Sequence, residues 1–232
     1  MTENQIGKLV VLEGLDGSGK SVQFGLLRDY LEAHKYPIVT VDFPDYEGSF
    51  FGKLVGRYLN GEFGDVYQVN PYVSSLLYAG DRLESRDKLV GWLNEGYWVL
   101  ANRYTGSNMA YHSAKVAPDA RPEFIAWLKR LEYDANRLPQ PDLTLFLHAP
   151  VATSQRMVAQ KAARSYTGSS HDIHERNQSY LQTVSEQYLW LCEHEPNWLR
   201  LNVTSADGEL LPRELIQGRI LEVLQERELI NA

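Results

Sequence analysis

Short apolar runs alternate along this chain with longer stretches in which apolar residues recur every three or four positions. The runs are rich in Val, Leu and Ile and end at Gly, Pro or a polar residue, which is typical of buried parallel strands. We expect strands at residues 8–13, 38–43, 97–101, 143–147 and 198–203. The periodic stretches predict helices with one buried face. They cover residues 21–34, 50–59, 71–95, 123–136, 151–163, 172–193 and 213–227.

The order of these elements predicts the fold class. Strands that alternate with helices form βαβ units, in which a parallel sheet carries helices on both faces. We therefore expect an α/β, three-layer fold with a five-stranded parallel sheet. The length suits one domain, residues 1–232, with a small lid at about 152–172. Ligands of such sheets bind at the carboxyl ends of the strands.

Composition and charge narrow the class of function. Hydrophobic residues make up 44% of the chain, enough for a sizeable core, and the formal net charge is −7. Proteins that bind nucleic-acid polymers usually carry the opposite charge, so we expect small ligands instead. Cys192 is the only cysteine, which excludes an internal disulfide and a cysteine-based zinc site. No segment resembles a signal peptide or a membrane span, so we expect a cytoplasmic protein without a membrane partner.

A glycine-rich loop follows the first expected strand and carries the clearest chemical signal. Its sequence, Gly-Leu-Asp-Gly-Ser-Gly-Lys-Ser, has the spacing of a Walker A motif. Glycines allow backbone N–H groups to converge on phosphate oxygens, Lys20 would reach the β- and γ-phosphates, and Ser21 would ligate Mg²⁺. The motif predicts a P-loop fold that binds a nucleoside triphosphate. The expected ATP-binding residues are Gly14, Leu15, Asp16, Gly17, Ser18, Gly19, Lys20, Ser21 and Val22.

Several further stretches, in order and at matching spacing, resemble the thymidylate kinases. They are residues 10–21, Phe43-Pro44, 51–55, 58–59, 76–82, 102–111 and 139–143. The resemblance extends over nearly the whole chain. It implies a transferase that converts ATP and dTMP into ADP and dTDP, with Mg²⁺ as the cofactor and both nucleotides as the small-molecule partners. Family members are commonly homodimers, and residues 72–93 could supply the shared face or simply belong to the core.

The resemblance also assigns roles to single residues. Arg103 would clamp the acceptor phosphate and the transferring phosphoryl group. Tyr78 would stack on thymine and Arg82 would hydrogen-bond the base, with a core tyrosine and a solvated arginine as the alternative interpretation. Tyr111 would select deoxyribose, and Asp16 would contact the acceptor sugar. The expected catalytic residues are Lys20, Asp16, Arg103 and Arg164, and the expected acceptor-binding residues are Phe43, Tyr78, Arg82, Arg103, Ser107, Asn108 and Tyr111.

The expected lid contains the candidate for a catalytic cation. The glycine-rich loop has no arginine of its own, and some thymidylate kinases carry this arginine in the lid instead. A lid arginine that closes over the γ-phosphate would stabilise transition-state charge and exclude water. Arg164 is the first candidate and Arg156 the second, while a solvated helix end is the alternative interpretation of this stretch.

Three positions depart from the family pattern. Asn102 stands where the family usually has an Asp that holds Mg²⁺ or its waters, so Ser21 and Asn102 are the expected metal residues. Asp45 stands where many members have an arginine that meets the acceptor phosphate, and Lys53 would have to compensate. Val22 replaces a hydroxyl residue expected near the α-phosphate.

These departures keep two alternatives open. One is a kinase for another nucleotide or for a free deoxynucleoside, in which Asp42 or Asp45 would serve as the base for a neutral hydroxyl. The other is a nucleotide-binding regulatory homologue with little or no turnover. We expect an active dTMP kinase, because the acceptor is already an anion and needs no strong base.

Overall fold

A single parallel sheet forms the centre of the protein. The computed structural model describes residues 7–65, 69–164 and 178–231. All neighbouring strands pair in parallel, in the order β2-β3-β1-β4-β5, which confirms the predicted five-stranded sheet. The strands are β1 (Lys8–Glu13), β2 (Ile38–Asp42), β3 (Trp98–Asn102), β4 (Leu143–His148) and β5 (Trp198–Asn202).

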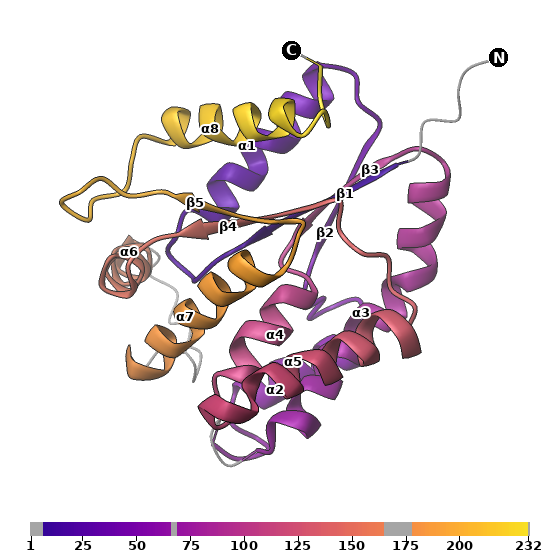
Figure 1. Cartoon of the computed structure of the whole chain (residues 1–232), viewed down its shortest axis with the longest axis vertical. Helices are drawn as coiled ribbons and strands as arrows, with labels where there is room; N and C mark the ends of the chain where they lie inside the picture. Colours follow the sequence, from indigo (N-terminus) through magenta and orange to yellow (C-terminus); the bar gives the residue numbers. More distant parts are fainter. Residues whose placement is uncertain (1–6, 66–68, 165–177, 232) are drawn as a thin grey trace.

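Helices cover both faces of this sheet, as Figure 1 shows. Helices α1 and α8 lie on one face, and α3, α4, α5 and α7 lie on the other, so the three-layer α/β architecture is confirmed. The helices are α1 (Lys20–Ala33), α2 (Phe50–Leu59), α3 (Pro71–Asn94), α4 (Thr105–Ser113), α5 (Arg121–Lys129), α6 (Val151–Arg164), α7 (Gln178–His194) and α8 (Arg213–Glu226).

Two helices differ from their predicted form. The stretch expected as one helix over 123–136 continues from α5 into a π-helical segment, η2 (Arg130–Ala135). The hydrophobic pattern did not predict α4, because its buried face consists largely of small and polar residues. The expected helix 172–193 appears as α7, and residues 172–177 lie outside the described part.

The alternation of side chains along the strands builds the core. Val10 and Leu12 of β1 pack in the cluster that includes residues of α1 and α8, whereas Leu9 and Val11 pack with Leu89 of α3 on the opposite face. Successive residues of a strand point to opposite faces, so one buried strand serves both layers. In the described residues, no helix is long and apolar enough to cross a membrane.

The sheet register places the chemical groups. Leu12, Asn102 and Asp42 are aligned on β1, β3 and β2, near the strand ends. The loops that follow these strands therefore begin beside one another. This edge is where ligands of parallel sheets bind, and the glycine-rich loop between β1 and α1 lies in its middle.

Candidate active site

The glycine-rich loop has the backbone conformation that its sequence predicts. Gly14, Gly17 and Gly19 have φ values of 152°, 86° and 88°, which L side chains rarely adopt. Helix α1 begins at the end of this loop, so its N-terminal dipole points toward the site. The ammonium of Lys20 lies 2.8 Å from each of the carbonyl oxygens of Gly14 and Leu15. The loop therefore holds its lysine over the space where motif chemistry places phosphate.

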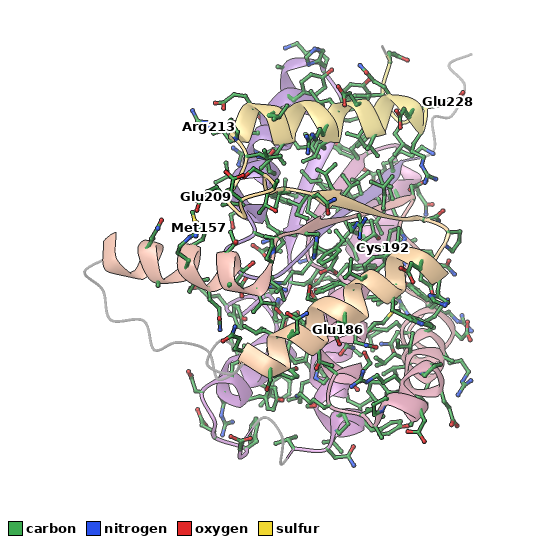
Figure 2. The ribbon with its side chains drawn as sticks, turned by 60° about the vertical axis from the view of Figure 1, so that its left-hand side comes forward. Met157, Glu186, Cys192, Glu209, Arg213 and Glu228 are labelled. Carbon is green, nitrogen blue, oxygen red and sulfur yellow. The ribbon has the colours of Figure 1, made fainter. Side chains whose placement is uncertain are left out.

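Helix α6 lies against this loop. A Cβ on Gly17 would approach the carbonyl oxygen of Ser154 to 2.1 Å, so this contact requires glycine. Figure 2 shows α6 projecting beyond the sheet near the loop that carries Glu209. Arg156 forms an ion pair of 3.0 Å with Glu209. Arg164 ends α6, and its side chain lies outside the described residues, so its expected role stays a prediction.

Arg103 connects β3 to the loop and to α4. Its φ of 62° lies in the left-handed region, a strain that proteins tolerate mostly at functional sites. Its backbone N–H donates to the carbonyl of Leu12, its Nη2 donates to Asp16 at 2.6 Å, and its Nη1 donates to Ser107 at 3.2 Å. The guanidinium also lies 5.5 Å from the ring centre of Tyr111. The predicted phosphate clamp is therefore held rigidly beside the loop.

The charges of this site change the pKa of Lys20 and Asp16. Burial lowers the pKa of Lys20, the positive charge of Arg103 lowers it further, and Asp16 only partly compensates, so the value is about 8. For Asp16, the surrounding protein displaces water and raises the pKa, but Arg103 and Lys20 outweigh this effect. The pKa of Asp16 therefore lies well below its usual range, and Asp16 is a carboxylate at neutral pH.

Glu13, the last residue of β1, was not singled out from the sequence. Its fully buried carboxylate accepts hydrogen bonds from the backbone N–H of Tyr104 and Ser107, the Ser107 hydroxyl and the Tyr188 hydroxyl. Because Ser107 also accepts from Arg103, Glu13 aligns the start of α4 with the guanidinium. The sequence signal that could have identified Glu13 is a glutamate at the end of an apolar strand. A carboxylate buried at such a position needs several hydrogen-bond donors around it.

A cavity of about 320 Å³ opens beside Arg103. It contains most of the acceptor-binding residues predicted from sequence, including Tyr78 and Tyr111, and the side chains of α6 form part of its wall. Described residues that line it are Leu15, Asp16, Phe43, Pro44, Tyr46, Leu59, Tyr78, Arg82, Arg103, Tyr104, Ser107, Tyr111, His112, Ser154, Gln155, Val158, Ala159 and Leu181.

Arg82 reaches this cavity from a buried polar cluster. Its side chain donates to both carboxylate oxygens of Glu132 and, through Nη1 at 3.4 Å, to the carbonyl of Tyr104. Asn108 donates to the same carboxylate at 2.7 Å and to Ser75 at 3.2 Å. Asn108 is buried and is not among the residues that line the cavity. Its expected contact with the acceptor stays a prediction.

Comparison with known proteins assigns the family. The sequence model of the thymidylate kinase family matches residues 12–214. The chain belongs to this family. The thymidylate kinase of Mycobacterium tuberculosis is 30% identical over 205 residues, which cover 87% of this chain and 94% of that protein. A probable thymidylate kinase of Thermococcus gammatolerans is 31% identical over 226 residues, which cover 92% of this chain and all of that protein.

Comparison with a solved structure supports the same assignment. The structure of the thymidylate kinase from Candida albicans superposes with a TM-score of 0.71 at 25% identity, covering 96% of this chain and 92% of that one. That enzyme is described as having a broad substrate specificity. The resemblance seen in the sequence is therefore confirmed at the level of family and fold.

The predicted metal residues lie at the edge of this kinase site. Ser21 is exposed in the first turn of α1, and Asn102 ends β3. The side-chain oxygen of Asn102 is buried without a hydrogen-bond partner among the described residues. No group of three His, Cys, Asp or Glu side chains suited to a metal occurs in the part of the chain that the structure describes. Mg²⁺ that binds together with nucleotide phosphates keeps several of its waters, so it needs only a few oxygen ligands from the protein. Ser21 and Asn102 therefore fit this ion.

Asp45 has a structural contact in this chain. Its carboxylate accepts a hydrogen bond of 2.8 Å from the backbone N–H of Gly48, and its own N–H donates to Asp81. Asp81 is buried, and burial raises the pKa of its carboxyl group. Asp45 therefore stabilises the turn before α2. Compensation by Lys53 for a missing arginine stays a prediction.

Proposed function

We propose that this kinase transfers the γ-phosphoryl group of ATP to dTMP, giving ADP and dTDP. The observation that supports it most is the position of Arg103 between the phosphate loop and the cavity. One guanidinium adjoins Asp16 of the loop and lines the acceptor space at the same time. A donor phosphate on the loop and an acceptor phosphate in the cavity would therefore meet beside one fixed positive charge.

The lining of the cavity suits a nucleoside monophosphate. Phe43, Tyr78 and Tyr111 offer aromatic faces and edges for a base and a sugar, and Arg82 offers N–H donors from a fixed position. The phosphate would lie toward Arg103. We propose Tyr78 and Arg82 as the base-binding pair, and Tyr111 as the residue that disfavours a ribose 2′-hydroxyl.

The chemistry requires positioning and charge rather than a strong base. The acceptor phosphate is an anion, so a side chain that removes a proton is not needed. The ammonium of Lys20 donates hydrogen bonds to two carbonyl oxygens of the loop. The charged oxygens of a triphosphate are stronger acceptors, so Lys20 would donate to them when the nucleotide binds. Arg103 holds the acceptor and the transferring group in line. Mg²⁺, for which Ser21 and Asn102 are the proposed residues, supplies neutralisation of phosphate charge when bound.

The lid is proposed to complete the site. Helix α6 already contributes Gln155 and Val158 to the cavity wall and contacts the phosphate loop at Gly17. Arg164 lies at the far end of the same helix. We retain Arg164 as the proposed cation of the lid, since Arg156 is engaged with Glu209.

An assay of acceptor preference tests this function. Purified protein with ATP and Mg²⁺ should release ADP most efficiently with dTMP, in a coupled assay that compares dTMP, dUMP, UMP, dGMP and thymidine. Lys20→Met should lower kcat by about 10²-fold or more, because transition-state charge loses a fixed donor. Turnover of thymidine but not dTMP would favour the deoxynucleoside kinase, and ADP binding without turnover would favour the regulatory homologue.

Location in the cytoplasm stays a prediction.

Assembly as a homodimer is also proposed. Four apolar side chains on α3, Val73, Leu76, Leu83 and Val90, are between 37% and 58% exposed. A stripe of this kind on one helix suits a two-fold helix contact with a second copy.

Light scattering after size-exclusion chromatography checks the dimer. Leu76→Glu should shift the protein from dimer to monomer, because a buried unpaired carboxylate opposes association. Leu215→Glu on α8 is the matched control, since Leu215 is exposed to a similar degree, 46% against 44% for Leu76. A wild-type protein that elutes as a monomer at micromolar concentration would contradict the proposal.

A further inference from the structure

The ends of β2 and β3 form an unusual pair. Asp42 and Asn102 are register partners on neighbouring strands. The side-chain nitrogen of Asn102 lies 3.1 Å from each carboxylate oxygen of Asp42. The side-chain oxygen of Asn102 is turned away from this contact and is buried without a hydrogen-bond partner among the described residues. The amide nitrogen thus orients the carboxylate of Asp42, and the amide oxygen stays buried on the other side of the group.

Asp42 differs from the other two carboxylates at this edge. Glu13 is buried and accepts from four donor groups, so it has no capacity for a ligand. Asp16 is engaged by Arg103 and Lys20. Asp42 is exposed, accepts from Asn102 among the described residues, and lies within electrostatic reach of Arg103 and Lys20. Asp16 and Asp42 are both exposed, but only Asp42 of these three carboxylates combines exposure with the absence of a cation partner among the described residues.

We propose that Asp42, held by Asn102, supplies the carboxylate that binds the hydrated magnesium ion of the bound nucleotide. The inference rests on the proposed nucleotide site. Mg²⁺ in such sites is bound through one or two carboxylates together with phosphate oxygens and waters, and a neutral amide alone is a weak ligand set. In this chain the negative charge lies on the strand next to Asn102, where the amide nitrogen of Asn102 holds the carboxylate of Asp42. Asn102, the metal residue expected from the sequence, then acts on the ion through Asp42, as a positioning residue.

Metal affinity measured without turnover tests the inference. Mn²⁺, which electron paramagnetic resonance detects when free in solution, is titrated into the full-length protein saturated with ADP or a non-hydrolysable ATP analogue. Asp42→Asn should weaken Mn²⁺ binding by about 10-fold or more, as loss of a partner of the metal shell typically does. The exchanged variant Asp42→Asn/Asn102→Asp should restore the affinity to within about threefold of wild type on the same basis. Asp119→Asn, which replaces an exposed carboxylate in the short 3-10 helix Pro118–Ala120, is the matched control.

Each outcome distinguishes the alternatives. Unchanged Mn²⁺ affinity in Asp42→Asn would overturn the inference, and so would an exchanged variant that stays as weak as Asp42→Asn. If Asp42→Asn does not fold, Asp42→Ser is a second variant without the carboxylate, and the same loss of affinity is expected. Unchanged Mn²⁺ affinity with lost phosphorylation of thymidine would instead make Asp42 a base. Failure of the wild-type protein to bind ADP in the presence of EDTA would contradict the proposed function rather than this inference alone.

Discussion

Replacement of Arg103 by alanine should lower kcat/KM for dTMP by about 10³-fold, within the range that removal of a transition-state arginine produces. The guanidinium is fixed by Asp16 and Ser107 and lines the acceptor cavity, so its position is set before substrate arrives. In the proposed reaction, a charge held in place in this way would stabilise the transferring phosphoryl group without reorganisation. Steady-state kinetics with dTMP and ATP would measure the loss.

Arg103→Lys separates charge from geometry. Lysine keeps the positive charge but lacks the planar fork of donors that reaches Asp16 and an acceptor phosphate together. We expect Arg103→Lys to recover little of the lost kcat/KM. Arg28→Ala is the matched control, because Arg28 forms an exposed pair with Asp29 on α1. Activity of Arg103→Ala within tenfold of wild type would contradict the assigned role.

Replacement of Glu132 by alanine should destabilise the protein by about 3–5 kcal/mol, as the loss of one partner of a buried ion pair does. Glu132 is fully buried, and Arg82 is only 1% exposed. The change leaves Arg82 as an uncompensated buried charge and also removes an acceptor from Asn108. Equilibrium unfolding in urea would give the free energy, and the midpoint should fall without a large change in slope.

Replacement of both partners tests the cause of this loss. Arg82→Met/Glu132→Met should be more stable than Glu132→Ala, because removal of both charges leaves neither uncompensated. Glu195→Gln is the comparison at a more exposed pair with Lys129, where the effect should stay within about 1 kcal/mol. Equal losses for Glu132→Ala and Glu195→Gln would contradict the argument. Binding of dTMP should weaken in Arg82→Met if this arginine meets the base.

Local signals account for the parts of the site that were predictable from sequence. The phosphate loop is a short segment whose glycines set its own backbone, and Lys20 bonds to carbonyls five and six residues away. The strands and most helices follow from the period of apolar residues, which burial on one or two faces imposes. Ser107 and Arg103 come together because Ser107 lies in the first turn of α4 and Arg103 lies just before that helix.

The partners of the remaining site residues required the tertiary structure. Glu13 meets Tyr188 across 175 positions, Arg82 meets Glu132 across 50, and Asn102 meets Asp42 across 60. The period of apolar residues does not predict these contacts between residues far apart in the sequence. Strand order and the π-helical segment that carries Glu132 bring the groups together.

The sequence by itself determined the α/β class, through the period of burial, the family, through its ordered motifs, and the backbone of the glycine-rich loop, through contacts between near neighbours. The tertiary structure alone decided that Arg82 is paired, that Asn108 is bonded to the same Glu132, and that Asn102 orients Asp42. Buried polar groups must find partners wherever the fold places them, and that placement depends on sheet order and register rather than on the order of residues along the chain.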